Sequence, residues 1–314
     1  MARVLGALGR IFITAGVLLF LFVGFQLWGT GLEESAGQSQ VGSSFVHAEP
    51  AARRPANDDP ATVAASLATI DGTAAATTPA PAEGSAGGVI KIPKIGMEKF
   101  FVEGTAKADL KKGPGHYIGT PLPGQAGNAA IAGHRTTYGA PFNRIDELVP
   151  GDRIEIYTDQ GRFVYEVVAP PDGVGIERGP GWYTVRPSGS SVLDNTADNR
   201  LTLTACHPKY SAQQRIIVTA KLVSDAAPTT PRPPDRTATA ASTKRAEPSA
   251  DLGGDPGALL PAILFGLGAA LVWLLTWLAS KRFNTILCYA LGAPAFFVLL
   301  WFCFKFTDHW LPSL

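Results

Sequence analysis

Three long apolar runs constrain this chain more than any other feature of its sequence. They cover residues 11–28, 258–279 and 283–304, and each approaches the roughly 20 apolar residues that a helix needs to cross a bilayer. Trp273, Trp277 and Trp301 are aromatics of the kind found near membrane interfaces. A pair of buried core helices is the alternative interpretation of the last two runs, but we favour a transmembrane hairpin.

The cations beside these runs predict their orientation. Arg3 and Arg10 precede the first run, and Lys281 and Arg282 lie between the other two. Cations in short loops stay cytoplasmic, so residues 30–255 are expected outside the cytoplasm, at the cell membrane. We interpret the first run as a signal anchor, and a long signal peptide cleaved near Ala48 is the alternative.

Two segments have the composition of disordered linkers. Residues 30–87 and 225–255 are rich in Ala, Thr and Pro and poor in aromatic residues, so they bury too little apolar surface to fold. We therefore expect six parts: an N-terminal transmembrane anchor at 1–29, a disordered linker at 30–87, a folded domain at 88–224, a disordered linker at 225–255, a transmembrane helical hairpin at 256–305 and a tail at 306–314.

The folded domain is predicted to be all-β. Short β-branched runs alternate with turn residues, which is typical of a sandwich or barrel. Short helices are expected at 107–112 and 141–148, and a hairpin turn at 159–161. We favour a compact barrel with short helices, flanked by transmembrane helices. The predicted strands cover residues 89–95, 100–103, 128–132, 153–158, 162–168, 201–205 and 215–222.

The charge of the chain argues against a nucleic-acid partner. Its formal net charge is +1, and no basic cluster lies on a segment that also carries aromatic residues. The membrane is the partner that the sequence predicts directly.

Cys206 is the first candidate for chemistry. The other two cysteines, Cys288 and Cys303, lie in the last apolar run, so the exported part holds an unpaired thiol, and a thiol retained in an oxidising compartment suggests use. Cys206 ends an alternating strand, and Pro208 prevents its continuation. Arg215 opens the next strand nine residues later, where a short loop can return its guanidinium to the sulfur.

His134 ends another apolar strand and completes a possible set of nucleophile, acid/base and oxyanion donor. With ordinary pKa values near 8.5 and 6.5, the thiolate–imidazolium pair is roughly one per cent or less at pH 7. Taken singly, each residue also has a structural interpretation: an inert thiol, a hydrogen-bonded histidine and a surface arginine. His116 is interpreted as structural and His207 as outward-facing. No metal or cofactor is expected, because a zinc site needs ligands that this domain lacks.

Four segments taken together resemble the sortase family. They are GPGHY at 113–117, GTPLPG at 119–124, NAAIAGHR at 128–135, and TLTAC at 202–206 with Arg215 following. The resemblance implies a sortase-like eight-stranded β-barrel and a cysteine transpeptidase with Cys206, His134 and Arg215 as catalytic residues. It also implies cleavage of a C-terminal LAxTG/LPxTG-type sorting signal after its Thr through a Cys thioacyl intermediate. The implied partners are sorting-signal-bearing surface proteins and an envelope amine such as a peptidoglycan precursor.

The subclass is predicted from residues 134–142 and from Cys206-His207-Pro208, which are most similar to class E of actinobacteria. Class C pilin polymerases are the alternative, but their lid carries Asp-Pro-aromatic, and Asp59-Pro60-Ala61 lacks the aromatic. Thr204, Ala205 and Tyr138 are expected in the substrate groove. A thiol endopeptidase that ends in hydrolysis and a catalytically silent membrane tether are the other functions considered.

Overall fold

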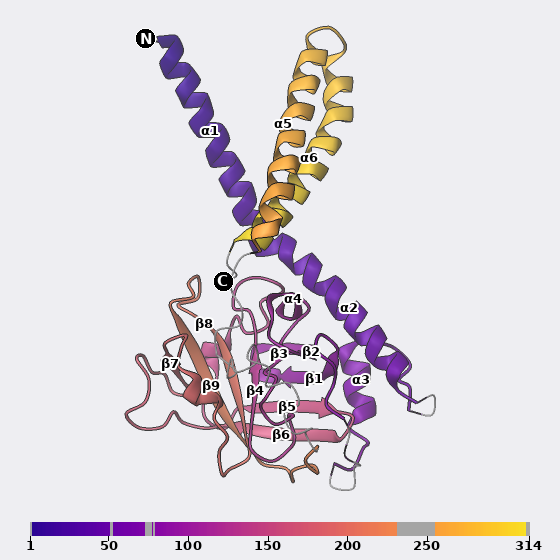
Figure 1. The fold of residues 1–314 in the computed structure, drawn as a ribbon, viewed down its shortest axis with the longest axis vertical. Coiled ribbons are helices and arrows are strands. Elements are labelled where there is room, and N and C mark those ends of the chain that lie inside the picture. Colours follow the sequence, from indigo (N-terminus) through magenta and orange to yellow (C-terminus); the bar gives the residue numbers. More distant parts are fainter. Residues whose placement is uncertain (1, 51–52, 73–76, 78, 231–254, 312–314) are drawn as a thin grey trace. The chain divides into compact units, whose positions relative to one another are not determined.

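The computed structural model describes residues 2–50, 53–72, 77, 79–230 and 255–311. The chain divides into two compact units, one of residues 1–26 with 252–313 and one of residues 27–251 (Figure 1). Most of the predicted linker at 225–255 lies outside the described residues, as does the end of the tail at 306–314.

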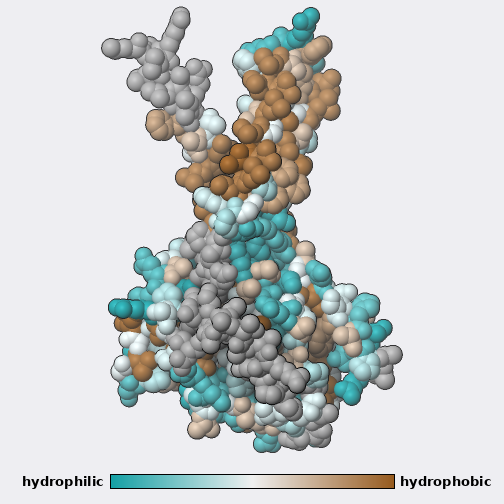
Figure 2. Space-filling model, in the orientation of Figure 1, coloured by the Kyte–Doolittle hydropathy of each residue, from teal (hydrophilic) through white to brown (hydrophobic). Residues whose placement is uncertain are grey.

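The first unit contains long apolar helices. They are α1 (Ala2–Gly24), which continues into a π-helical turn (Phe25–Gly29), α5 (Leu259–Ser280), preceded by a 3₁₀ turn (Pro256–Ala258), and α6 (Thr285–Trp310). Apolar side chains cover the visible face of α5 and α6 (Figure 2). Among the described residues, three helical segments are long and apolar enough to cross a membrane: Phe12–Ala48, Pro256–Ser280 and Thr285–Trp310.

Close packing explains the hairpin of α5 and α6. Gly292 lies so near Thr276 that an added Cβ would approach the threonine hydroxyl to 2.1 Å. Asn284 begins α6 by accepting hydrogen bonds from the N–H groups of Ile286 and Leu287, as an N-cap does. Helix α6 runs to Trp310, beyond the predicted end of the hairpin at residue 305.

The second unit is built on a β-barrel, as predicted. Its sheet has the strand order β6-β5-β1-β2-β3-β4-β8-β9-β7, and pairing of β6 with β9 closes eight of these strands into the barrel. Strand β7 pairs with residues 215–218 of β9, next to residues 220–222 that pair with β6. The strands are β1 (Ala86–Ile92), β2 (Met97–Glu103), β3 (Gly115–His116), β4 (Asn128–Ala132), β5 (Arg153–Thr158), β6 (Gly161–Val167), β7 (Trp182–Val185), β8 (Arg200–His207) and β9 (Gln214–Leu222).

The barrel interior follows from alternation along the strands. Side chains that point inward are Val, Ile, Leu, Phe and Ala, for example Leu201, Leu203 and Ala205 of β8, and they form the main core. All seven predicted strands are present within a few residues. The two that were not predicted, β3 and β7, have two and four residues, too few to show a period of two.

The predicted helices are only partly correct. Helix α4 (Lys107–Leu110) lies in the first predicted range. The second range, 141–148, contains a 3₁₀ turn (Ile145–Glu147) in place of an α-helix, because its backbone bonds join residues three apart, as from Ile145 N to Phe142 O. Further 3₁₀ turns cover Pro93–Ile95 and Ser190–Leu193.

Residues 30–87 differ most from expectation, because they are not a disordered linker throughout. Helices α2 (Thr30–Ala48) and α3 (Pro60–Leu67) pack on the outside of β1 and β2. A second apolar cluster lies between them and the barrel. Its buried residues are Val41, Val46, Val63, Ala64, Leu67, Val89, Phe100, Val102 and Tyr157.

Two local features explain how so polar a segment docks. Gln38 of α2 donates to the carbonyl oxygens of Phe100 and Lys112 at 3.0 and 2.6 Å, and accepts from the Phe100 N–H at 2.9 Å. Asp59 is the N-cap of α3, accepting from Thr62 N at 2.9 Å, with Pro60 at the first helical position. The Asp59-Pro60 pair therefore starts a helix.

Candidate active site

Cys206 lies near the end of β8, on the face of the strand opposite the barrel core. The inward side chains of this strand are Leu201, Leu203 and Ala205, so Thr202, Thr204 and Cys206 point outward by alternation. The cysteine is buried, with 7% of its surface exposed.

Arg215 is the direct cross-strand neighbour of Cys206. Strands β8 and β9 are antiparallel, and their register pairs Cys206 with Arg215. The loop between the two strands returns the arginine to the cysteine, as the sequence predicted. The Arg215 guanidinium is buried and donates to the carbonyl oxygens of Ala212 and Gln214 at 3.0 and 3.1 Å, which holds it at the strand end.

His134 approaches from the other side of β8. Strands β4 and β8 are parallel, Ala132 pairs with Thr204, and the Gly133 N–H donates to the Thr204 carbonyl at 3.0 Å. Strand β4 ends at Ala132, and His134 follows two residues later in the loop that starts beside the end of β8, where Cys206 lies. Strands β4, β8 and β9 are neighbours, and His134, Cys206 and Arg215 lie at or just beyond their ends on one side of the barrel.

The loop that carries His134 is tightly constrained. The aromatic ring of Phe142 lies so close to Gly133 that an added Cβ would be 2.5 Å from it. Nδ1 of His134 and the hydroxyl of Thr137 form a hydrogen bond at 3.4 Å, and the ring packs on Tyr138 with centroids 5.1 Å apart. Tyr138 and Ala140 have φ values of 50° and 43°, a left-handed conformation that costs a non-glycine residue roughly 1–3 kcal/mol each.

Opposing effects act on the Cys206 thiol. Burial raises its pKa because the thiolate is poorly solvated, while the positive charges of Arg215 and then Arg135 lower it. The net direction is upward, so the thiol is the resting form at neutral pH. Charge stabilisation by the two arginines is then available to the thiolate once it forms.

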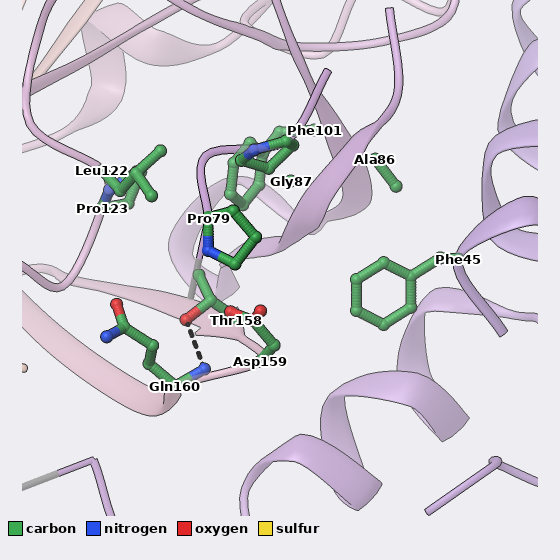
Figure 3. A pocket seen from close by; sticks show the side chains of 11 residues that line it. Phe45, Pro79, Ala86, Gly87, Phe101, Leu122, Pro123, Thr158, Asp159 and Gln160 are labelled. Atoms are coloured by element: carbon green, nitrogen blue, oxygen red, sulfur yellow. Dashed lines mark hydrogen bonds between the residues drawn. The ribbon is translucent and has the colours of Figure 1, made fainter. Parts of the chain in front are cut away.

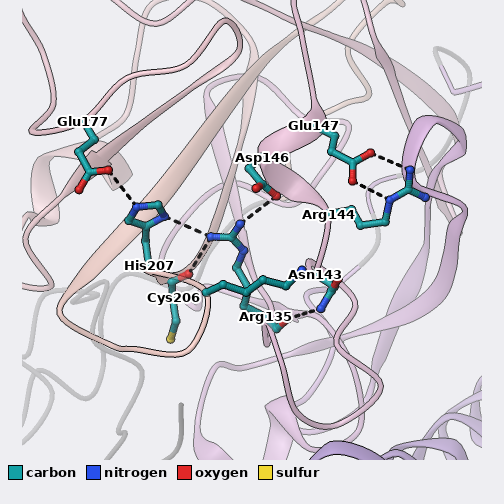
Figure 4. Close-up of polar contacts among 9 residues, drawn as sticks. Arg135, Asn143, Arg144, Asp146, Glu147, Glu177, Cys206 and His207 are labelled. Carbon is teal, nitrogen blue, oxygen red and sulfur yellow. Dashed lines mark hydrogen bonds and ion pairs between the residues drawn. The ribbon is translucent and has the colours of Figure 1, made fainter.

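Arg135 and His207 form a second polar group beside Cys206 (Figure 4). One terminal nitrogen of Arg135 donates to the Cys206 carbonyl at 3.4 Å and to Nδ1 of His207 at 3.2 Å. Its other terminal nitrogen is 2.8 Å from Asp146. His207 is mostly buried and its Nε2 lies 3.3 Å from Glu177, so it does not face outward as predicted.

The three residues expected in the substrate groove have different surroundings. Thr204 is on the outward face with Cys206, and its hydroxyl shares a 2.9 Å hydrogen bond with the hydroxyl of Tyr117. The Ala205 side chain packs in the barrel core, away from that face. Tyr138 is buried, with its ring against His134 and with Lys111 5.0 Å above it.

Tyr117 belongs to a buried network that includes His116. Burial raises the Tyr117 pKa to about 12, so its hydroxyl stays protonated. Nδ1 of His116 lies 2.7 Å from Glu103, and its Nε2 lies 2.9 Å from the Pro121 carbonyl. This histidine is structural, as predicted. No group of three His, Cys, Asp or Glu side chains that could hold a metal ion occurs within the described ranges.

A separate pocket lies at the α2 side of the barrel (Figure 3). Phe45 of α2 faces Ala86, Gly87 and Phe101 across it, and residues 158–160 of the β5–β6 turn close one end. None of its lining residues belongs to the rim of Cys206, so this pocket has no part in the catalytic arrangement.

Sequence reasoning missed Arg135 and Tyr117 as site residues. Arg135 follows His134 directly, but its side chain reaches Cys206 only because β4 and β8 are neighbours. Tyr117 is in a motif that was recognised, yet its contact with Thr204 spans 87 positions of the chain. The one sequence feature that could have pointed to Tyr117 was the adjacent His116-Tyr117 pair beside a glycine.

Comparisons with known proteins agree with this geometry. A model of the sortase domain matches residues 90–223. Sortase SrtE1 of Streptomyces coelicolor is 32% identical over 234 residues, which are 70% of this chain and 57% of that protein. Sortase SrtE2 of the same organism is 28% identical over 232 residues, 71% of this chain and 83% of that protein.

Solved structures include sortase E from Streptomyces avermitilis, which is 35% identical, with a TM-score of 0.39 over 46% of this chain and 91% of that one. The chain spans little more than half the length of SrtE1. The matched family model, the two curated class E relatives and the cysteine at the barrel rim agree. The chain therefore belongs to the sortase family.

Proposed function

We propose that this chain is a membrane-anchored transpeptidase with Cys206 as nucleophile, His134 as acid and base, and Arg215 as oxyanion donor. One observation carries the proposal. The antiparallel register of β8 with β9 pairs Cys206 with Arg215, and the parallel pairing of β4 with β8 ends at Gly133 and Thr204, directly before His134. Nucleophile, proton donor and cation are the groups that acyl transfer requires.

In the first half of the reaction, neutral His134 takes the proton of the Cys206 thiol, and the resulting thiolate attacks the carbonyl carbon of the scissile amide. The Arg215 guanidinium stabilises the negative oxygen of the tetrahedral intermediate. The carbon–nitrogen bond breaks as the His134 imidazolium gives its proton to the leaving amine. The products are a thioester on Cys206, a neutral His134 and a released amine.

In the second half, an acceptor amine attacks the thioester carbonyl and loses a proton to neutral His134. The carbon–sulfur bond breaks, which regenerates the thiolate and the imidazolium and forms a new amide. Water in place of the amine would give hydrolysis by the same route. Burial of the thiol disfavours free thiolate and so limits reaction of the resting enzyme with other electrophiles.

The substrate of this proposal is a LAxTG/LPxTG-type sorting signal on a surface protein, cleaved after its Thr. The acceptor is an envelope amine such as a peptidoglycan precursor. Thr204 is the groove residue best placed beside the nucleophile, with Tyr117 as its hydrogen-bond partner. The cations at Arg3, Arg10, Lys281 and Arg282 support a catalytic unit outside the cytoplasm.

Mass spectrometry tests the proposal. The full chain in detergent is mixed with a set of Leu-Ala-x-Thr-Gly and Leu-Pro-x-Thr-Gly peptides without an amine. A covalent adduct ending at Thr is expected on Cys206, and Cys206→Ala should give none. Adding diglycine should convert the adduct to an amide product. If water removes the adduct at the same rate with and without the amine, the chain is an endopeptidase. If no peptide gives an adduct, the proposal is rejected.

A further inference from the structure

Arg135 is a buried cation that joins the two segments of the proposed catalytic pair. It follows His134 in sequence, and its terminal nitrogen contacts both the carbonyl of Cys206 and Nδ1 of His207. Its own carbonyl accepts a hydrogen bond from the Asn143 side chain at 3.0 Å. The Sγ of Cys206 points away from this guanidinium, so Arg135 contacts the main chain of the nucleophile (Figure 4).

The hydrogen bond from Arg135 determines which ring nitrogen of His207 carries the hydrogen. A guanidinium can only donate, so Nδ1 of His207 must be the unprotonated acceptor. The ring hydrogen is then on Nε2, where it faces the Glu177 carboxylate at 3.3 Å. A continuous chain of contacts thus runs from Asp146 through Arg135 and His207 to Glu177.

This arrangement is poorly suited to stability alone. Arg135 is 2% exposed, whereas its carboxylate partner Asp146 has a side chain 42% exposed. Within the part of the chain that the structure describes, the buried Nε of Arg135 has no hydrogen-bond partner. Burying a guanidinium with incomplete compensation costs free energy, and replacing a buried ion pair as a whole by apolar side chains is often neutral or stabilising.

We propose that Arg135 and His207 are positioning residues that set the spacing between His134 and Cys206. Arg135 holds the end of β8 through the Cys206 carbonyl and His207, and it carries the preceding residue, His134, at the same time. This inference rests on the proposed function, because the spacing matters only if these two residues act together. Loss of the guanidinium fork should therefore impair turnover more than folding.

Kinetics with the full chain in detergent test this inference, using the peptide that acylates the enzyme fastest and diglycine as the amine. Arg135→Lys keeps the charge but loses the planar fork, and Arg135→Met loses both. Both should lower kcat about tenfold or more with KM within about threefold, because small displacements of reacting groups are costly. Arg144→Met is the matched control, since the half-exposed Arg144 pairs only with the nearby Glu147 in Figure 4.

Two further measurements separate positioning from a general structural role. Alkylation of Cys206 by iodoacetamide does not need His134, so Arg135→Lys should react within about threefold of the unaltered protein. His207→Asn retains an acceptor near the place of Nδ1 and should keep most of the turnover, whereas His207→Leu should lose it as Arg135→Met does. Turnover and alkylation that fall together, in proportion to the folded fraction, would overturn the proposal.

A cross-linking measurement decides the inference without any peptide. In His134→Cys, a reagent with two thiol-reactive groups about 5 Å apart should join the new cysteine to Cys206. Adding Arg135→Lys should lower the yield about threefold or more, while adding Arg144→Met should not. Unchanged cross-linking and unchanged kcat in Arg135→Lys reject the positioning role. A missing thioacyl adduct in the unaltered protein rejects the proposed function instead, and the cross-linking result still stands.

Discussion

The backbone N–H of Gly133 donates to the carbonyl oxygen of Thr204 at 3.0 Å, the last bond between β4 and β8 before the strands reach His134 and Cys206. The hydrogen bonds of a parallel pair are evenly spaced, so this bond fixes how the two strands are aligned where they end. A slip by one residue would send the His134 side chain to the other face. The site thus depends on one short stretch of strand pairing.

We expect the pH dependence of Cys206 alkylation to show two effects on the thiol pKa, one from burial and one from the charge of Arg215. Burial raises the pKa of the thiol above its ordinary value, so the alkylation rate should rise with pH through a midpoint in the alkaline range. The Arg215 charge favours the thiolate, and its removal in Arg215→Met should move the midpoint higher still.

Iodoacetamide rates between about pH 6 and pH 11 measure this midpoint in the full chain. The control is Arg153→Met, whose side chain is 65% exposed and far along the sequence from the rim. A midpoint that falls or stays in place in Arg215→Met would contradict the assigned proximity of guanidinium and sulfur.

The Tyr117–Thr204 hydrogen bond should contribute measurably to stability. Tyr117→Phe and Thr204→Val each remove one partner of a buried bond, which typically costs about 1–2 kcal/mol. The double variant should lose less than the sum, by about 0.5–1.5 kcal/mol, because the second change no longer leaves a hydroxyl unpaired. Urea unfolding followed by near-UV circular dichroism measures these values, with exposed Tyr210→Phe as control. Additive losses would mean that the two hydroxyls are not coupled.

The buried Glu103–His116 pair should contribute more to the free energy of unfolding than a surface pair does. Both side chains are buried, so Glu103→Ala removes the carboxylate partner of a buried imidazole nitrogen and should cost about 1–3 kcal/mol. Glu98→Ala removes a partner of Lys91 on a more exposed part of the same strand and should cost less than about 1 kcal/mol. Equal losses in the same urea experiment would argue against a special role for the buried pair.

Gly42 should be essential for the docking of α2. An added Cβ there would lie 2.3 Å from the Asp58 carbonyl and 2.7 Å from the Phe100 ring, so Gly42→Val should displace the helix. Faster hydrogen exchange across residues 30–48 is the expected result. Gly31→Ala in the same helix meets no atom within 4 Å and should leave exchange unchanged or slower. Protection that survives Gly42→Val would show that α2 docks in some other way.

The sequence predicted the barrel well where a strand was long enough to show its period. The alternation of β8 and the apolar run of β4 were both visible. The same reasoning missed α2 and α3, because their buried residues are few and small, and because Gln38 docks through hydrogen bonds that no hydropathy pattern reveals. Composition alone therefore suggested disorder where two helices pack.

The groove residues show the limit of reasoning from position in sequence. Thr204 and Ala205 are neighbours, yet one faces the nucleophile side and the other the core, as a pleated strand requires. Tyr138 follows His134 by four positions and packs against its ring, buried by the left-handed turn of the loop. Arg135 was passed over because its partners lie about 70 positions away.

By itself, the sequence determined the apolar runs long enough for a bilayer, the strand alternation of the barrel, and the identity of the thiol, imidazole and guanidinium. These are properties of single segments, set by hydropathy, length and residue chemistry. Only the tertiary structure decided that β4, β8 and β9 end at one rim in register, that α2 packs on β2, and that Arg135 connects His134 to Cys206. Those contacts join residues far apart in the chain, and their energies depend on packing that no local pattern contains.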